Sequence, residues 1–163
     1  MGGPEGRRWH ASCRTFPTAL SCWLAATFPN LYGTAAGANN LTGMTNAQMA
    51  AFYLTQFDLS GPKVEAQVLA VALDVYATTA CLGGSAGTAY GFTVSATGLG
   101  ARSFNVGSDG AAFGVANNTS RNVYELLKAV DQQSAFGSLY NGDTALQKEA
   151  NGLFDALNKA GAI

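Results

Sequence analysis

The chain has 163 residues, enough for one domain that buries roughly two thirds of its unfolded surface. Hydrophobic residues make up 48% of the sequence and charged residues only 12%, about half the usual charged share. The formal net charge is −1, and no block of Lys or Arg occurs outside Arg7, Arg8 and Arg14. This charge pattern argues against a nucleic-acid-binding protein.

Residues Met1–Pro17 crowd Gly, Pro and Arg together without a clear period. We expect an irregular leader, disordered or loosely packed, ahead of one globular domain at residues 18–163. The leader does not match a secretory signal peptide, because Ser12, Arg14 and Pro17 interrupt its apolar run. If the domain is exported, we expect the signal on a longer parent chain.

The cysteines Cys13, Cys22 and Cys81 cannot all pair with one another, and their spacings form no CxxC unit. The pattern therefore disfavours a zinc site and a redox dithiol. We expect free or buried thiols, with a single disulfide as the alternative.

Two helices are predicted before residue 60. The first begins at Thr18, an acceptable N-cap, and ends before Pro29, because the residue preceding a proline is pushed out of the helical region. An irregular loop over 30–43 follows. The second helix begins at Thr45, with Gln48 completing a capping box. The apolar faces of these helices comprise Leu20, Trp23, Leu24, Phe28, Met49, Phe52, Tyr53 and Phe57.

The stretch Pro62–Leu82 is apolar nearly all round, which predicts a buried central helix. Its main stripe comprises Val64, Val68, Val71, Val75 and Leu82. Glu65 and Asp74 interrupt the run, so it falls short of the ~18 to 20 uncharged residues that span a bilayer.

After a glycine-rich break at Gly83–Gly87, the period changes to alternation over Tyr90–Thr97 and again over Arg102–Val106. This pattern predicts a glycine-rich β-hairpin or three-stranded meander at 90–115. Helix returns from about Ser120 to about Gly137, and a last helix begins at Asp143 or Thr144. The predicted fold is therefore mainly α (α+β), with about five helices around 62–82 and one small sheet.

Several stretches together resemble a known family: WLAATFPNLYG (23–33), NNLTG with TNAQ (39–48), AYGFTVSATGLGARSFNVGSDGAAFGVANN (89–118) and LFDALNKAGAI (153–163). It is an uncharacterised module that recurs in very large secreted or surface proteins of planctomycete-type bacteria, near other repeat modules or dockerin-like ends. The resemblance implies an extracellular setting and a helical domain with a hairpin; it supplies no activity and no catalytic residues. Cys22 and Ala162 depart from the usual Asn and Asp, and the leader lacks the usual Trp-x-Asn-x-x-Gly segment.

Gly83–Gly87 fits G-x-S-x-G, with Ser85 as the nucleophile. In α/β-hydrolases that elbow follows a strand and opens a helix, whereas here a helix precedes it and a strand is predicted after it. The only histidine, His10, lies in the leader. We therefore favour a glycine-rich hinge. Ser60–Lys63 matches S-x-x-K, but its internal proline favours a helix cap.

Two turns gather oxygen-bearing side chains. Asn105 and Asp109 lie in one of them, and Asn141 and Asp143 lie in the other. Calcium accepts carboxylate, amide and backbone oxygens in such turns. Neither cluster completes an EF-hand loop, and Asn and Asp are ordinary turn residues, so turn chemistry is favoured and a Ca²⁺ site is the alternative.

Aromatic side chains beside the glycine-rich loops offer a further option, because exposed rings stack on sugars or on a partner surface. If they are buried instead, they form the core of the small sheet, and we favour that interpretation. The candidates are Tyr32, Tyr90, Phe104, Phe113 and Tyr140.

The leading hypothesis is a non-enzymatic extracellular or cell-surface module, structural or adhesive, that binds a polymer, a carbohydrate or a protein. The alternative is a small secreted hydrolase of esters or lactones, including acyl-homoserine lactones, with the acyl chain in an apolar groove. In that mechanism a divalent ion polarises the carbonyl, and Asp109, Asp143 or Glu149 holds the metal or acts as base. Ser85 as a nucleophile is the weaker variant.

Overall fold

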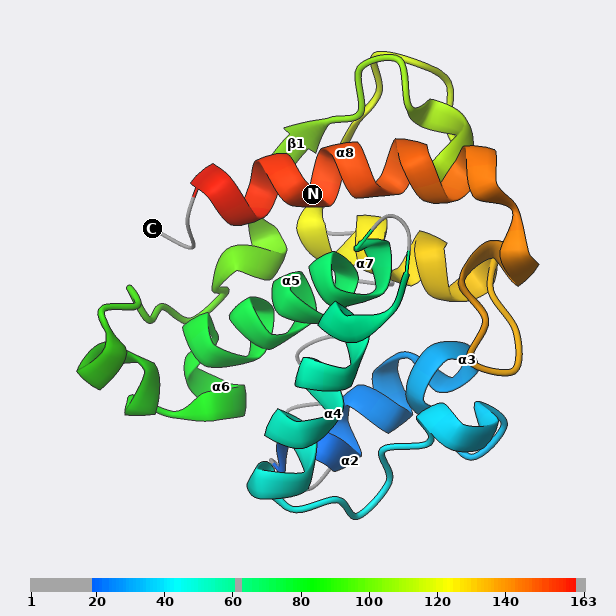
Figure 1. The fold of residues 1–163 in the computed structure, drawn as a ribbon. Helices are drawn as coiled ribbons and strands as arrows, with labels where there is room; N and C mark the ends of the chain where they lie inside the picture. The colour runs from blue at the N-terminus through cyan, green and yellow to red at the C-terminus, as the bar shows by residue number, and fades with distance from the viewer. Residues whose placement is uncertain (1–18, 61–62, 161–163) are drawn as a thin grey trace.

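The computed structural model describes residues 19–60 and 63–160, so the predicted leader Met1–Pro17 lies outside the described residues. The fold is mainly helical with one small two-stranded sheet, which confirms the predicted class (Figure 1). Within the described part, no helix is both long and apolar enough to cross a membrane. The helices are α2 (Leu20–Thr27), α3 (Pro29–Tyr32), α4 (Asn46–Asp58), α5 (Val64–Thr78), α6 (Ala80–Gly83), α7 (Val123–Gln132) and α8 (Thr144–Ala160).

Helix α5 is the central element, as predicted. Val68, Leu69 and Val75 are at most 1% exposed, and each buried side chain of this size stabilises the fold by roughly 1.5–3 kcal/mol. Helix α8 packs along α5, and α4 packs on it from another side (Figure 1). The core therefore surrounds α5, and the remaining helices cover it.

Helix α5 ends at Thr78, four residues before the predicted end, and α6 continues in a new direction. The hydroxyls of Thr78 and Thr79 donate to the carbonyls of Asp74 and Val75. Beyond them the chain at Ser95 crosses the helix end: its N–H donates to Thr78 O (2.9 Å), and its carbonyl accepts from Ala80 N (2.8 Å). The helix stops because another segment takes over its backbone hydrogen bonds.

That crossing also explains where the predicted meander differs from the structure. Strand β1 (Ser103–Asn105) lies in the predicted second strand, but its antiparallel partner is β2 (Ser120–Asn122). The stretch 90–97 docks on the end of α5 instead, between glycines at positive φ, Gly91 and Gly98. The predicted third strand forms a 3₁₀ helix, η4 (Gly110–Phe113).

Two other loops contain short helices. Pro29 begins α3, since its fixed φ suits the first helical position, and a 3₁₀ turn, η1 (Gly37–Asn39), follows within the predicted loop. The remaining 3₁₀ turns are η2 (Ala86–Tyr90), η3 (Leu99–Ala101) and η5 (Leu139–Gly142).

Side-chain caps set several helix boundaries. The predicted capping box of α4 is present: Gln48 N donates to Thr45 Oγ1 (3.2 Å), and Thr45 N donates to Gln48 Oε1 (2.9 Å). Helix α7 begins with a second capping box, between Asn122 and Glu125. At the far end of α4, Lys63 Nζ donates to the carbonyls of Phe57 and Leu59. The lysine of the S-x-x-K match thus caps the C-terminal end of α4, whereas Gly61 and Pro62 of the predicted cap lie outside the described residues.

Of the cysteines among the described residues, Cys22 is a free, half-buried thiol. Cys81 is disulfide-bonded. The alternative of one disulfide therefore describes the chain better than free thiols alone.

Candidate functional site

Ser85 lies in the exposed turn between α6 and η2. Its carbonyl accepts from Thr88 Oγ1 (2.7 Å) and Thr88 N (3.1 Å), so the residue starts a 3₁₀ turn. A helix precedes the motif and a 3₁₀ helix follows it, which is not the strand–turn–helix order of a nucleophile elbow. In Figure 1 this turn lies on the opposite side of the molecule from the start of α8, where Asp143 lies.

The first predicted metal cluster lies in the turn after β1. Asn105 Oδ1 accepts from Gly107 N (2.8 Å), and Asn105 Nδ2 donates to Asn118 O (3.0 Å). Asp109 Oδ1 accepts from Ser108 Oγ at 3.4 Å. The amide of Asn105 therefore serves the turn itself.

The second predicted cluster lies at the start of α8. Asp143 Oδ1 accepts from Ala145 N (3.0 Å) and Leu146 N (3.1 Å), as an N-cap does. Asn141 Nδ2 donates to Gln133 O (3.3 Å). Over residues 19–60 and 63–160, no three or more His, Cys, Asp or Glu side chains gather as metal ligands do. The mixed Asn and Asp sets stay a prediction.

Glu149, the third carboxylate of the hydrolase hypothesis, also contacts backbone. Its Oε2 accepts from Ala112 N (3.2 Å) and so joins α8 to η4. Tyr140 Oη donates to Ala112 O at 2.7 Å. Burial, together with the charge of Glu149, raises the pKa of Tyr140, so its hydroxyl stays protonated and remains a donor.

The predicted aromatic candidates divide clearly. Tyr32, Phe113 and Tyr140 are buried, and Phe104 is half-buried, so they belong to the core or its edge. Tyr90 alone is exposed, at 83%. Most of these rings are therefore buried, as favoured, but they belong to the main core and not to a separate core of the small sheet.

Sequence reasoning missed a polar clamp on α7. Asp131 is 2% exposed, and its Oδ1 accepts from the backbone N–H groups of Asn30 and Leu31, both at 3.0 Å. Lys128 Nζ donates to Thr27 O (2.6 Å), at the end of α2. Burial raises the pKa of Asp131, whereas the Leu31 N–H, Lys128 and the Asn30 N–H lower it. Lys128 and Asp131 fix the junction of α2 and α3. The signal available in the sequence was the position of these two charged residues beside the apolar stripe of the predicted helix.

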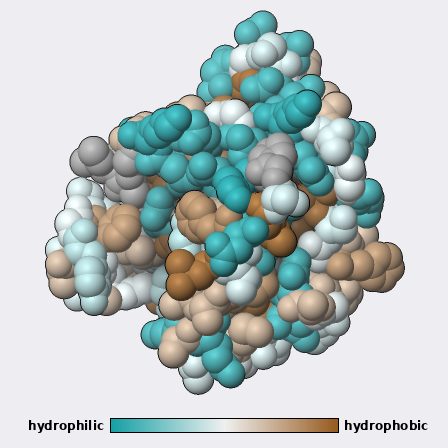
Figure 2. Space-filling model, in the orientation of Figure 1, coloured by the Kyte–Doolittle hydropathy of each residue, from teal (hydrophilic) through white to brown (hydrophobic). Residues whose placement is uncertain are grey.

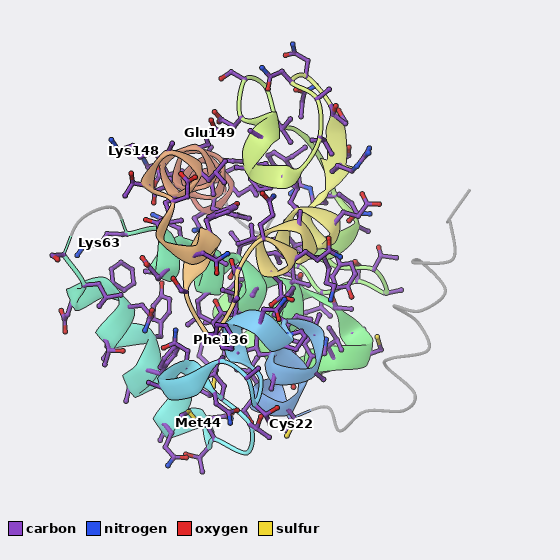
Figure 3. All side chains as sticks on the ribbon, turned by 90° about the vertical axis from the view of Figure 1, so that its right-hand side faces the viewer. Cys22, Met44, Lys63, Phe136, Lys148 and Glu149 are labelled. Atoms are coloured by element: carbon purple, nitrogen blue, oxygen red, sulfur yellow. The ribbon has the colours of Figure 1, made fainter. Side chains whose placement is uncertain are left out.

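The second missed feature is the exposed ring of Phe136, in the loop from α7 to α8 (Figure 3). Ala135 and Ser138 pair as in a two-residue hairpin, and both central residues have positive φ: 52° at Phe136 and 77° at Gly137. This is the pattern of a type I′ turn, which favours Asn-Gly. A bulky side chain at positive φ costs of order 1 kcal/mol, yet this ring is 81% exposed and is a poor contributor to the core.

The Phe136 turn is held rigidly by the chain around α3. Gly137 N donates to Asn30 O (2.8 Å), and Asn39 Nδ2 donates to Gly137 O (2.9 Å). A Cβ on Gly137 would lie 2.5 Å from Ala36 O, so only glycine fits this close approach. The ring is thus presented on a fixed base.

Charged residues are unevenly distributed over the structure. Between Ala19 and Phe57 the sequence has no Asp, Glu, Lys, Arg or His, and 132–142 has none either. These segments form α2, α3, α4 and the Phe136 turn, which lie together in the lower part of Figure 1. We call the surface of 19–57 and 132–142 the uncharged face. In Figure 2 the most hydrophilic residues gather over α8 and the loops above it.

Grooves on the described residues include two whose linings do not contain Ser85. One, of about 230 Å³, follows α7 and is lined by Tyr124, Glu125 and Lys128 among others. The other, of about 290 Å³, lies beside η3 and is lined by Thr93, Ser95 and Arg102 among others. Neither groove contains Asp109, Asp143 or Glu149.

No family model matches the sequence, and no curated protein or solved structure is significantly similar to it. The resemblance to the planctomycete-type surface module therefore stays a prediction.

Proposed function

We propose that the protein is a non-catalytic module that works outside the cell and acts by binding a neutral partner through its uncharged face. The observation that carries this proposal is the exposed Phe136 ring on a strained turn, among segments whose own sequence has no charged residue. Strain that the fold retains without a gain in core packing supports a role for the exposed side chain. Exposed large rings are also frequent anchors of interfaces.

The environments of the predicted catalytic carboxylates support the same proposal. Asp143 caps α8, and Glu149 joins α8 to η4. A general acid, base or metal ligand needs oxygen atoms that converge on one reacting position. These carboxylates instead accept backbone hydrogen bonds that set local structure, and Ser85 lies on another side of the molecule.

A hydrolysis assay tests the non-catalytic part of the proposal. Purified full-length chain is incubated with generic ester and acyl-homoserine lactone substrates, with added calcium and with chelator. We expect rates equal to buffer and a melting temperature that calcium leaves unchanged. Turnover that is lost in Asp109→Ala or Asp143→Ala and abolished by the chelator would replace the module with the metal-assisted hydrolase. Turnover lost in Ser85→Ala would indicate the serine variant.

A further inference from the structure

The turn that leads into α8 ends in an Asn-Gly pair, Asn141–Gly142, and the sequence has a second such pair, Asn151–Gly152. In such a pair the backbone nitrogen of the glycine can attack the side-chain carbonyl carbon of the asparagine. Glycine favours this attack because it has no Cβ to obstruct the close approach. The two pairs share this chemistry but lie in different surroundings, and the surroundings decide which of them reacts.

The pair Asn141–Gly142 lies at the surface. Both residues are exposed, and they end the single 3₁₀ turn η5. A Cβ on Gly142 would meet no atom within 4 Å, so the space around this residue is open. The hydrogen bonds of Asn141 are long: its Nδ2 donates to Gln133 O at 3.3 Å, and its backbone N donates to Ser138 O at 3.2 Å. Rotation of the backbone at Asn141 therefore breaks only weak contacts.

The backbone conformation of Asn141 lowers the cost of that rotation. Its φ is 52° and its ψ is 30°, in the left-handed region that residues with a Cβ adopt at a cost. These angles must change before Gly142 N reaches the side-chain carbon of Asn141. Because Asn141 leaves a strained conformation, the strain of the turn offsets part of the cost of reaching the reactive geometry.

The pair Asn151–Gly152 is held inside helix α8. In an α-helix each backbone N–H donates to the carbonyl four residues earlier, which fixes the direction of the nitrogen. The next two residues, Leu153 and Phe154, are buried in the core. Reaction at Asn151 requires the middle of α8 to open and expose them, and such opening is far rarer than movement of an exposed turn.

We propose that Asn141 is a site of spontaneous deamidation and that the helix protects Asn151. Gly142 N loses its proton to hydroxide and bonds to Cγ of Asn141, the Cγ–Nδ2 bond breaks, and Nδ2 leaves as ammonia. Water then opens the cyclic imide at either carbonyl, which gives aspartate or isoaspartate. The net reaction converts an amide and water into a carboxylate and ammonium, so it needs no oxidant or reductant. This inference does not depend on the proposed function.

The modification changes the turn in two ways. The product has no Nδ2 donor for Gln133 O, so that hydrogen bond is lost. The new carboxylate also brings the first negative charge into the segment 132–142, next to the helix cap Asp143. Deamidation therefore adds a charge to the uncharged face as the molecule ages.

Peptide mapping tests the proposal, because trypsin separates the two pairs. Cleavage after Lys128, Lys148 and Lys159 gives peptide 129–148 with Asn141 and peptide 149–159 with Asn151. The full chain is kept at mildly alkaline pH, folded or in urea, and mass spectrometry follows the acid form of each peptide. Fragment spectra distinguish Asn141 from the glutamines of its peptide, and an isoaspartyl methyltransferase detects isoaspartate.

We expect Asn141 to convert many times faster than Asn151 in the folded chain, and both to convert at similar rates in urea. Equal rates in the folded chain would overturn the proposal. The same preference for Asn141 in urea would also overturn it, because the local sequence and not the fold would then set the difference.

Gly142→Ala tests the attacking nitrogen, because its methyl group hinders the approach. We expect the conversion of Asn141 to slow severalfold and that of Asn151 to stay the same. Gly152→Ala is the matched control: its Cβ meets no atom within 4 Å, and alanine favours the helix. Thermal melts should show both variants folded. A conversion of Asn141 that Gly142→Ala leaves unchanged, or that both variants slow equally, would contradict the assignment.

Discussion

The uncharged segment 19–57 and the later chain, from about residue 100 onward, use different means to hold their structure. The first relies on rings and neutral caps: Trp23 and Phe28 meet edge to face at 5.8 Å, and Phe28 and Tyr32 do so at 6.4 Å. The later chain uses carboxylates as acceptors for backbone N–H groups, at the start of α7 and α8 and between α8 and η4. The difference teaches that Glu125, Asp143 and Glu149 serve structural junctions.

Lys128 and Asp131 are the charged residues of the later chain that hydrogen-bond to segment 19–57, among the hydrogen bonds described above. Replacing Asp131 tests this connection most severely. Asp131→Ala leaves the buried N–H groups of Asn30 and Leu31 without their acceptor, so we expect a loss of about 3 kcal/mol or more in the free energy of unfolding. Urea denaturation measures this loss.

Lys159→Ala is the control for that experiment. Lys159 pairs with Asp155 at 2.6 Å on the surface of α8, and its side chain is 75% exposed. Such pairs contribute about 0.5 kcal/mol at most. If Asp131→Ala costs no more than Lys159→Ala, the clamp does not hold the two regions together.

Alanine substitutions at two glycines distinguish two reasons for glycine in the Phe136 turn: a close contact with the 33–40 chain, and the positive φ of the backbone. Both Gly137 and Gly142 have positive φ, but only at Gly137 would a Cβ meet neighbouring atoms. We expect Gly142→Ala to cost about 1 kcal/mol and Gly137→Ala roughly 2 kcal/mol more. Equal losses of stability in urea denaturation would mean that the turn does not rest on the 33–40 chain.

The stability of the fold should depend on pH, because burial raises the pKa of Asp74 on α5 from 3.8 to about 6. The folded state then binds this proton more tightly than the unfolded chain, so stability falls as pH rises from about 4 to about 6. Asp74→Asn should raise the stability at pH 7 by about 1 kcal/mol, allowing for solvent around the carboxyl. Urea denaturation at pH 5 and pH 7 checks this prediction; a variant with the same stability difference between the two pH values as the original would contradict it.

Much of the fold follows from the sequence because the signals are local. The apolar circumference of α5 and the Thr45–Gln48 capping box depend on spacing within one helix, and both are confirmed. The pairing of β1 with β2 was not predictable in this way. The alternating stretch 90–97 fits a strand equally well, and only the tertiary contact of Ser95 with the end of α5 excludes it from the sheet.

The candidate site was less predictable than the fold. A search of the sequence for catalytic or metal-binding residues selects Asp, Asn and Ser, and so it selects Asp109 and Asp143. The same residue types are also common in turns and helix caps. The Phe136 turn was not predicted because a type I′ turn is normally recognised by an Asn-Gly pair, and here phenylalanine precedes the glycine. The clamp of Asp131 joins residues about 100 positions apart in the sequence, a separation that no local pattern reveals.

The central claim, that the acidic residues of the later chain serve structure, is tested most directly by Glu149→Gln. Urea denaturation measures its free energy of unfolding, and ester and lactone turnover is measured for the same protein and for the original chain. The account predicts lower stability, because the Ala112 N–H loses a charged acceptor, and no turnover in either protein. Turnover that Glu149→Gln abolishes at unchanged stability would contradict the account.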